Sequence, residues 1–204
     1  MKKSLDEHAD RFSEHAADYD EEQDSPEYRA CADLVVAHAD PADDDVVLDL
    51  GTGTGAIAFG LADAAGEVVG RDISEGMLDR AREKAADRGV GNVGFGEGRF
   101  RDPQVPDGVD VDVVTSNFAM HHLGDDEKRE AIDTIAALGP RRIVLGDVMF
   151  FGEPNPEEPF YSPEVDDPAT VGVLVDAFTD AGYALTAVEM VGDQVGVLVA
   201  ERQD

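Results

Sequence analysis

The sequence predicts a single α/β domain with one doubly wound, mostly parallel sheet. Short runs rich in β-branched residues alternate with stretches of helical periodicity along most of the chain. The 204 residues are enough for one domain with a real core and too few for two ordinary domains. Hydrophobic residues make up 42% of the chain, which is typical of a globular protein. We therefore treat residues 1–204 as one folding unit.

Seven strands are expected, and their order indicates how the sheet is built. They lie at 46–50, 68–70, 93–95, 111–114, 142–145, 184–191 and 195–200. Helical stretches between several of the first five strands allow these to run parallel, with helices on both faces of the sheet. Only Gly192-Asp193-Gln194 separates the last two strands, so they can form only an antiparallel hairpin.

The helices show capping residues and apolar faces. Ser74 can cap one helix and Asp125 another, each followed by apolar residues at helical spacing. A further helix is expected around 169–181, after a loop at 152–168 rich in Pro, Glu and Asp. Residues 1–40 are expected to form a helical cap, over the ligand edge of the sheet or beside it. Residues 41–204 would then form the ligand-binding core.

The net charge is strongly negative. There are 46 acidic and 16 basic residues, a formal charge of −30, and the acids are spread along the chain instead of forming one tail. We interpret this as adaptation to high salt, since such surfaces resemble those of salt-accumulating archaea. The same charge repels phosphate, which disfavours nucleic acid as a partner. No EF-hand spacing supports a calcium protein.

The expected location is the cytoplasm. No run of about 18 uncharged apolar residues is present, so no membrane span is expected. The amino terminus becomes acidic before an apolar signal segment could form. Cys31 is the only cysteine, which excludes an internal disulfide and a cysteine-rich zinc site. We expect it to be a small apolar residue on a helix.

The first motif follows the strand at 46–50. Asp49 lies near the strand end, and Gly51, Gly53 and Gly55 lead into a helix that begins near Ala56. Glycines let the backbone approach a ligand, and the helix start offers free N–H groups. The same glycines also fit the dinucleotide fingerprint, or a tight turn with no ligand. The Asp49 carboxylate would repel a pyrophosphate and attract a cationic sulfonium amino acid.

The second motif places a carboxylate at the end of the next strand. Asp72 lies 21 residues after Gly51. At this position a carboxylate can accept hydrogen bonds from both hydroxyls of an adenosine ribose. The alternative is that Asp72 only caps the following helix, although Ser74 is the better cap.

The third motif completes a resemblance to a known family. The fourth strand leads into Ser116-Asn117-Phe118-Ala119-Met120-His121-His122-Leu123. The order D-x-G-x-G-x-G, G-x-D-I-S-x-x-M-L and S-x-x-x-x-H-H-L resembles class I S-adenosylmethionine-dependent methyltransferases. It is most similar to the small-molecule subgroup whose first helix ends in A-x-x-Y-D, here residues 16–20. The resemblance spans about residue 12 to the final hairpin.

The resemblance implies a fold, a cofactor and an activity. The fold is the Rossmann-like seven-stranded sheet in which strand seven inserts beside strand five. The cofactor is S-adenosyl-L-methionine, and its methyl group moves by in-line displacement to a small-molecule acceptor. Because the sulfonium methyl is already activated, a base is needed only for an acceptor atom that carries a proton. The acceptor and the oligomeric state have no recognisable signal in the sequence.

The resemblance also implies roles for individual residues. Asp49 would lie under the methionine ammonium, Asp72 would hold the ribose, and Tyr19 and the two histidines would face the substrate. His121 and Tyr19 are the candidate catalytic residues. The expected cofactor-binding residues are Asp49, Gly51, Thr52, Gly53, Gly55, Asp72, Ile73, Met77, Arg99, Phe100 and Asn117.

Arg99 departs from the family pattern. The family carries Gly-Asp after the third strand, with a carboxylate that bonds the adenine amino group, whereas this chain has Gly98-Arg99. Arginine cannot accept a hydrogen bond. Arg99 could stack on adenine or pair with Asp72. Alternatively it points to solvent, and backbone groups at Phe100 bind the amine.

The paired histidines allow three interpretations. As metal ligands they are adjacent and lack further ligands at suitable spacing, so no metal is expected. As a base, one of them could deprotonate an O–H or N–H of the substrate. They could also only shape the pocket wall.

Two alternative functions share the same sheet. One is an NAD(P)-dependent oxidoreductase, which would lack the terminal hairpin and have no use for Asp49. The other is a non-catalytic S-adenosylmethionine-binding module, made conceivable by Arg99. A comparison of S-adenosylmethionine and NAD binding distinguishes the oxidoreductase from the methyltransferase. A methyl-transfer assay distinguishes the non-catalytic module from the enzyme.

Overall fold

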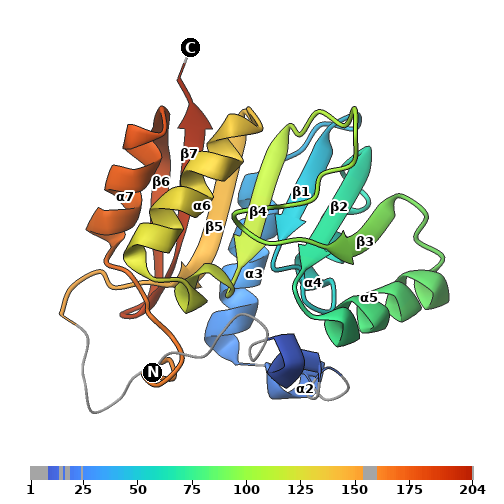
Figure 1. The fold of residues 1–204 in the computed structure, drawn as a ribbon, viewed down its shortest axis with the longest axis horizontal. Coiled ribbons are helices and arrows are strands. Elements are labelled where there is room, and N and C mark those ends of the chain that lie inside the picture. The colour runs from blue at the N-terminus through green and yellow to red at the C-terminus, as the bar shows by residue number, and fades with distance from the viewer. Residues whose placement is uncertain (1–8, 14–15, 17–18, 24, 154–159, 204) are drawn as a thin grey trace.

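The computed structural model describes residues 9–13, 16, 19–23, 25–153 and 160–203 and contains one seven-stranded sheet (Figure 1). The strand order is β3-β2-β1-β4-β5-β7-β6. The strands are β1 Val46–Leu50, β2 Glu67–Asp72, β3 Val93–Glu97, β4 Val113–Asn117, β5 Arg142–Val148, β6 Tyr183–Gly192 and β7 Val195–Arg202. β1 to β5 run parallel, and β7 is antiparallel to both of its neighbours. The predicted fold class, including the inserted terminal hairpin, is confirmed.

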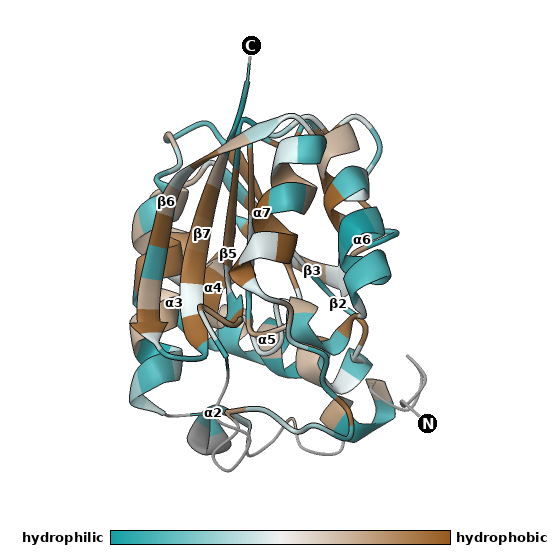
Figure 2. Cartoon of the chain, turned by 90° about the vertical axis from the view of Figure 1, so that its left-hand side faces the viewer, coloured by the Kyte–Doolittle hydropathy of each residue, from teal (hydrophilic) through white to brown (hydrophobic). Residues whose placement is uncertain are grey.

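Helices cover both faces of the sheet because its central strands are apolar on both sides. α3 (Pro26–Ala39) and α4 (Ala56–Leu61) share a core with Val47 and Val113. α6 (Asp125–Ala137) and α7 (Val171–Asp180) lie on the opposite face, in front of the sheet in Figure 1, and share a core with Leu48. α5 (Glu75–Arg88) packs against β2 and β3. Figure 2 shows apolar residues along β5 and β7 and hydrophilic residues on the outer side of α6.

The helix caps agree with the sequence at one position and differ at another. The Ser74 hydroxyl accepts a hydrogen bond from the Met77 N–H, as expected, and α5 begins at Glu75. The expected Asp125 cap is wrong, because α6 begins at Asp125 and its cap is Gly124. The Gly124 N–H donates to the Glu127 carboxylate at 3.0 Å. The Asp125 charge lies instead in the first turn, where it favours the helix start.

The described part of the amino-terminal 40 residues lies at two places, near the edge where the parallel strands end and against one face of the sheet. Residues 9–13 are helical, and α2 (Tyr19–Glu22) lies near the edge at which the parallel strands end (Figure 1). α3 packs beside the sheet against β4 and β5, with Cys31 fully buried. The 152–168 loop has no helix or strand in its described part, and residues 154–159 lie outside the described residues. No helix in the described residues is both long and apolar enough to cross a membrane.

The acidic side chains lie mainly on the surface. Among the described acidic residues only Asp45, Asp49 and Asp147 are buried. A net charge of −30 on such a surface repels itself at low ionic strength, and salt screens this repulsion. We expect the melting temperature to rise by several degrees between about 0.1 M and about 2 M KCl. Calorimetry at both concentrations checks this, and an unchanged melting temperature would contradict salt adaptation.

Candidate active site

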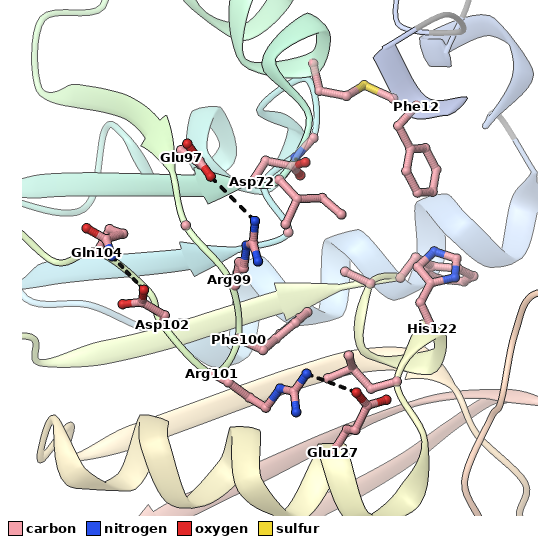
Figure 3. Close-up of a pocket in the computed structure, with 18 of the residues that line it drawn as sticks. Phe12, Asp72, Glu97, Arg99, Phe100, Arg101, Asp102, Gln104, His122 and Glu127 are labelled. Atoms are coloured by element: carbon pink, nitrogen blue, oxygen red, sulfur yellow. Dashed lines mark hydrogen bonds and ion pairs between the residues drawn. The ribbon is translucent and has the colours of Figure 1, made fainter. Parts of the chain in front are cut away.

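A pocket of about 870 Å³ opens at the edge where the parallel strands end (Figure 3). Its volume falls in the range of about 300–1,000 Å³ typical of small-molecule sites. Loops after β1, β2, β3 and β4 form its walls, together with the helical residues 9–13 and α2. The lining residues are Phe12, Tyr19, Gly51, Gly53, Asp72, Ile73, Met77, Glu97, Gly98, Arg99, Phe100, Arg101, Asp102, Gln104, Phe118, Ala119, His122, Leu123 and Glu127.

The glycine loop after β1 forms one wall. Gly51 and Gly53 line the pocket and have left-handed φ angles of 70° and 53°. A Cβ on Gly51 would lie 2.3 Å from the Cβ of Ala119, so the loop is packed closely against the segment after β4. Gly55 also has a left-handed φ, of 92°, and caps α4. Glycine is needed here because other residues rarely adopt this conformation.

Asp49 lies behind this loop and not on the pocket wall. Its carboxylate accepts hydrogen bonds from the Thr52 hydroxyl at 2.6 Å and the Thr115 hydroxyl at 2.9 Å. Asp49 is 1% exposed, and burial raises its pKa to about 6 in spite of these bonds. Asp49 and Thr52 therefore support the glycine loop from inside the protein. Their roles toward a ligand stay predictions.

The raised pKa of Asp49 gives an expected pH dependence of stability. Its folded-state pKa of about 6 exceeds the ordinary value of 3.8, so the folded protein holds this proton more tightly than the unfolded chain. The stabilisation is complete below the ordinary pKa and is lost as the pH rises through about 6. The loss is of the order of 3 kcal/mol. Because asparagine does not titrate, we expect the Asp49→Asn variant not to lose this stability as the pH rises.

Denaturant titrations at several pH values, at constant high salt, measure the effect. The difference in unfolding free energy between wild type and Asp49→Asn cancels the titration of the other carboxylates. If the difference in unfolding free energy did not change with pH, the raised pKa of Asp49 would be contradicted.

Asp72 lies on the pocket wall at the end of β2. One carboxylate oxygen accepts the Gly53 N–H at 2.8 Å and the other accepts the Ser74 N–H at 2.9 Å. Burial raises the pKa of Asp72 above its usual value. Ile73 and Met77 line the pocket next to it. Asp72 thus joins the loops after β1 and β2 and still faces the pocket, while Ser74 provides the helix cap.

The loop after β3 forms a polar rim (Figure 3). Arg99 and Asp102 exchange two backbone hydrogen bonds, which gives the loop a tight turn. The Arg99 side chain is 47% exposed and its guanidinium lies 3.9 Å from the Glu97 carboxylate. Arg99 therefore lies nearest to Glu97, a partner not expected from the sequence, and the expected pairing with Asp72 is not formed. Phe100 lines the pocket, as expected for a residue near adenine.

The end of β4 presents its backbone and Phe118 to the site. The Asn117 side chain is directed toward α3, because a Cβ on Gly146 would approach both its Oδ1 and Cys31 Sγ, at 2.6 and 2.7 Å. Asn117 is absent from the pocket lining. The family resemblance implies that its backbone carbonyl accepts a hydrogen bond from the methionine ammonium, and this role stays a prediction. Phe118 lines the pocket with a left-handed φ of 53°, which is strained for a non-glycine residue.

The two histidines occupy different positions. His121 is buried; its Nδ1 lies 2.5 Å from Asp147 Oδ1, and its backbone N–H donates to Asp147 Oδ2. His122 lines the pocket, with its Nδ1 2.7 Å from Asp166 Oδ1. Burial opposes charge on both rings and lowers the pKa of His122. At His121 the Asp147 and Asp166 carboxylates outweigh burial and raise the pKa.

Tyr19 and Phe12 close the pocket from the amino-terminal side. Both line it, and their rings meet edge to face at 6.4 Å, with Phe12 also 5.4 Å from the His122 ring. Burial raises the pKa of Tyr19 far above its usual value, so its phenol stays protonated at neutral pH. Tyr19 can therefore donate a hydrogen bond but is a poor general base.

The sequence analysis missed several residues of this site. Phe12, Asp147 and Asp166 lie outside the three motifs, and Phe118 lies inside the third motif at a position with no expected role. Asp147 could have been found, because it lies near the end of β5, at the same sheet edge as Asp72. Asp166 follows His122 by 44 residues within a loop, and no sequence spacing links the two.

Comparison with known proteins decides the family. Residues 47–139 match a family described as a methyltransferase domain. An uncharacterized methyltransferase of Bacillus velezensis is 30% identical over 152 residues, which cover 68% of this chain and 69% of the relative. The chain belongs to the methyltransferase family. It spans 47% to 66% of the length of three further methyltransferase relatives, so their full activities do not transfer directly.

Solved structures share the fold of this methyltransferase. One is the methyltransferase in complex with the Trm112 activator of Haloferax volcanii, with a TM-score of 0.77 at 20% identity, covering 95% of this chain and 98% of that chain. Another is the magnesium protoporphyrin IX methyltransferase of Synechocystis, with bound S-adenosylhomocysteine. Its TM-score is 0.70 at 23% identity, covering 87% and 86% of the two chains. The ligand of that neighbour is the demethylated form of the cofactor expected from the sequence.

Proposed function

We propose that this methyltransferase uses S-adenosyl-L-methionine to methylate a small-molecule acceptor. The observation that carries the proposal is the pocket wall formed by the Asp72 carboxylate and the left-handed glycines Gly51 and Gly53. The family membership supports methyl transfer. The terminal hairpin, with β7 inserted between β5 and β6, argues against an NAD(P)-dependent oxidoreductase.

The residues present fit the cofactor. Asp72 receives one backbone N–H on each oxygen, and a carboxylate has capacity for further donors, here the two ribose hydroxyls. Ile73, Met77 and Phe100 supply an apolar surface for adenine. Gly53 lines the pocket, and a Cβ there would have only the Tyr19 ring within 4 Å, at 3.9 Å, so its bare backbone is open to a ligand.

The protein's part in the reaction is binding, orientation and exclusion of water. The bound cofactor supplies an activated sulfonium methyl group. Phe12 and Phe118 line the pocket, and their apolar rings would keep water away from the part of a ligand that they contact. The protonated Tyr19 can donate a hydrogen bond that orients the acceptor, and His122 is the histidine on the pocket wall that can hold a proton from it.

The setting that we propose is a cytoplasm of high salt. Its support is the net charge of −30 on a surface whose acids are mainly exposed. The same charge disfavours a nucleic-acid acceptor.

Binding and turnover test the function separately. Calorimetric titration in molar KCl should show binding of S-adenosylmethionine and S-adenosylhomocysteine, and no binding of NAD. A panel of small hydroxyl, amine and thiol acceptors, with release of S-adenosylhomocysteine as the readout, tests transfer. The panel is run with and without an activator protein, since the Haloferax neighbour is complexed with one. Binding of NAD in preference to S-adenosylmethionine would overturn the proposal, and binding without turnover would favour the non-catalytic alternative.

A further inference from the structure

We propose that His121, His122 and Asp166 form a binding site for a divalent transition-metal ion at the wall of the pocket. Each residue offers one ligand atom, and the three atoms lie within 4.8 Å of one another. His122 Nδ1 is 2.7 Å and His121 Nε2 is 4.0 Å from Asp166 Oδ1. A tetrahedral ion with bonds of about 2.0–2.2 Å separates its ligands by about 3.3–3.5 Å, so small side-chain movements suffice.

Asp147 orients the first ligand. Its Oδ1 lies 2.5 Å from His121 Nδ1, and it also accepts the His121 and Val148 backbone N–H groups. With Nδ1 engaged, Nε2 is the nitrogen that faces Asp166. A carboxylate on the second nitrogen is the usual support of a metal-bound histidine. Asp147 is 2% exposed, so this support is built into β5 and is not a chance surface contact.

The local charge favours a cation at this point. Asp147 and Asp166 place two carboxylates around the histidines, and the side chains of His121 and Asp166 are only 9% and 8% exposed. Lys128 approaches from α6, with its ammonium hydrogen-bonded to the Leu123 and Asp167 carbonyl oxygens, and its single positive charge offsets one of the two carboxylates. Two imidazoles with one carboxylate suit zinc, cobalt and related ions better than magnesium or calcium.

The site would serve two purposes. Asp166 lies in the loop before α7, so an ion would hold that loop against the segment after β4; the Asp167 N–H already donates to the His121 carbonyl at 2.7 Å. Because His122 lines the pocket, the one tetrahedral position not filled by protein could take an oxygen or nitrogen of the acceptor; the ion would then lower the pKa of that group, in place of His122 accepting its proton. Metal binding itself does not depend on the proposed function.

Cobalt titration of the untagged protein tests the site. Excess Mg²⁺ is present to saturate weak sites on the acidic surface, and both calorimetry and the visible absorption of Co²⁺ are followed. We expect one equivalent of Co²⁺, displaced by Zn²⁺. His122→Ala and Asp166→Asn should weaken binding by about tenfold or more, and Asp147→Asn by about tenfold.

His38→Ala is the matched control. His38 Nε2 lies 2.5 Å from the Glu189 carboxylate, which is another histidine–carboxylate pair of the same chain. The His38→Ala variant should still bind one equivalent of Co²⁺, and the visible absorption of the bound Co²⁺ should be unchanged. If Asp166→Asn or Asp147→Asn fails to fold, His122→Ala decides, since this side chain is 19% exposed on the pocket wall.

Two results would overturn the proposal. One is the lack of a saturable equivalent of Co²⁺ in the presence of Mg²⁺. The other is equal affinity in His122→Ala and His38→Ala. A protein that binds Co²⁺ at this site but not S-adenosylmethionine would refute the proposed function and leave the metal site standing.

Discussion

Gly51→Ala is expected to weaken S-adenosylmethionine binding by about hundredfold or more. The φ of Gly51 is 70°, and alanine in this conformation costs about 1–2 kcal/mol. The new Cβ would also lie 2.3 Å from the Cβ of Ala119, which forces the glycine loop or the segment after β4 to move. Overpacking of this kind costs about 1–3 kcal/mol. Both segments line the pocket, so the movement distorts the cofactor site.

The Gly89→Ala variant separates the cost of a left-handed backbone from the cost of overpacking. Gly89 has a nearly equal φ of 65°, but a Cβ there would have no atom within 4 Å. This variant should lose about 1 kcal/mol of stability and bind the cofactor normally. Calorimetric titration of both folded variants gives the comparison. Equal binding by the two variants would show that the contact with Ala119 does not shape the site.

Asp72→Ala is the second large expected effect, a loss of about tenfold or more in affinity for S-adenosylmethionine and S-adenosylhomocysteine alike. Hydrogen bonds to a charged acceptor contribute about 1.5–3 kcal/mol each before losses to water. The variant also leaves the Gly53 and Ser74 N–H groups without their acceptor. The glycine loop should loosen, while Ser74 still caps α5.

Asp72→Asn and a second carboxylate on the same pocket sharpen this test. Asn keeps one acceptor oxygen and loses the charge, so its loss of affinity should be intermediate. Asp102 also lines the pocket, but it is exposed and pairs with Gln104, so Asp102→Asn should change affinity little. If Asp72→Ala bound as tightly as Asp102→Asn, the ribose assignment would be wrong.

The fold could be predicted from the sequence because its signals are local. The Val46–Leu50 run, the glycines after it and the two-residue turn before β7 each determine their own segment. The Asp125 cap failed because a glycine backbone, supported by Glu127, can close a helix without a side chain of its own. A search for capping side chains in the sequence does not detect such a helix start, because the capping residue is a glycine.

The site could be predicted only in part, because its remaining contacts join distant segments. Gly51 and Gly53 could be placed on the pocket because they follow β1, and Asp72 because it ends β2, at the same sheet edge. The sequence cannot tell which of two adjacent histidines faces the pocket, because the turn at Met120–His122 decides it. The neighbouring Asp166 depends on how a distant loop folds back.

The contact between Gly51 and Ala119 limits how this sequence can diverge. A Cβ on Gly51 and the Cβ of Ala119 would occupy the same space. A residue with a side chain at position 51 therefore requires glycine at position 119. Homologues should therefore show correlated substitution at these two positions, although they lie in separate motifs. A relative with alanine at the first position should carry glycine at the second, and the double variant should recover part of the packing lost in Gly51→Ala.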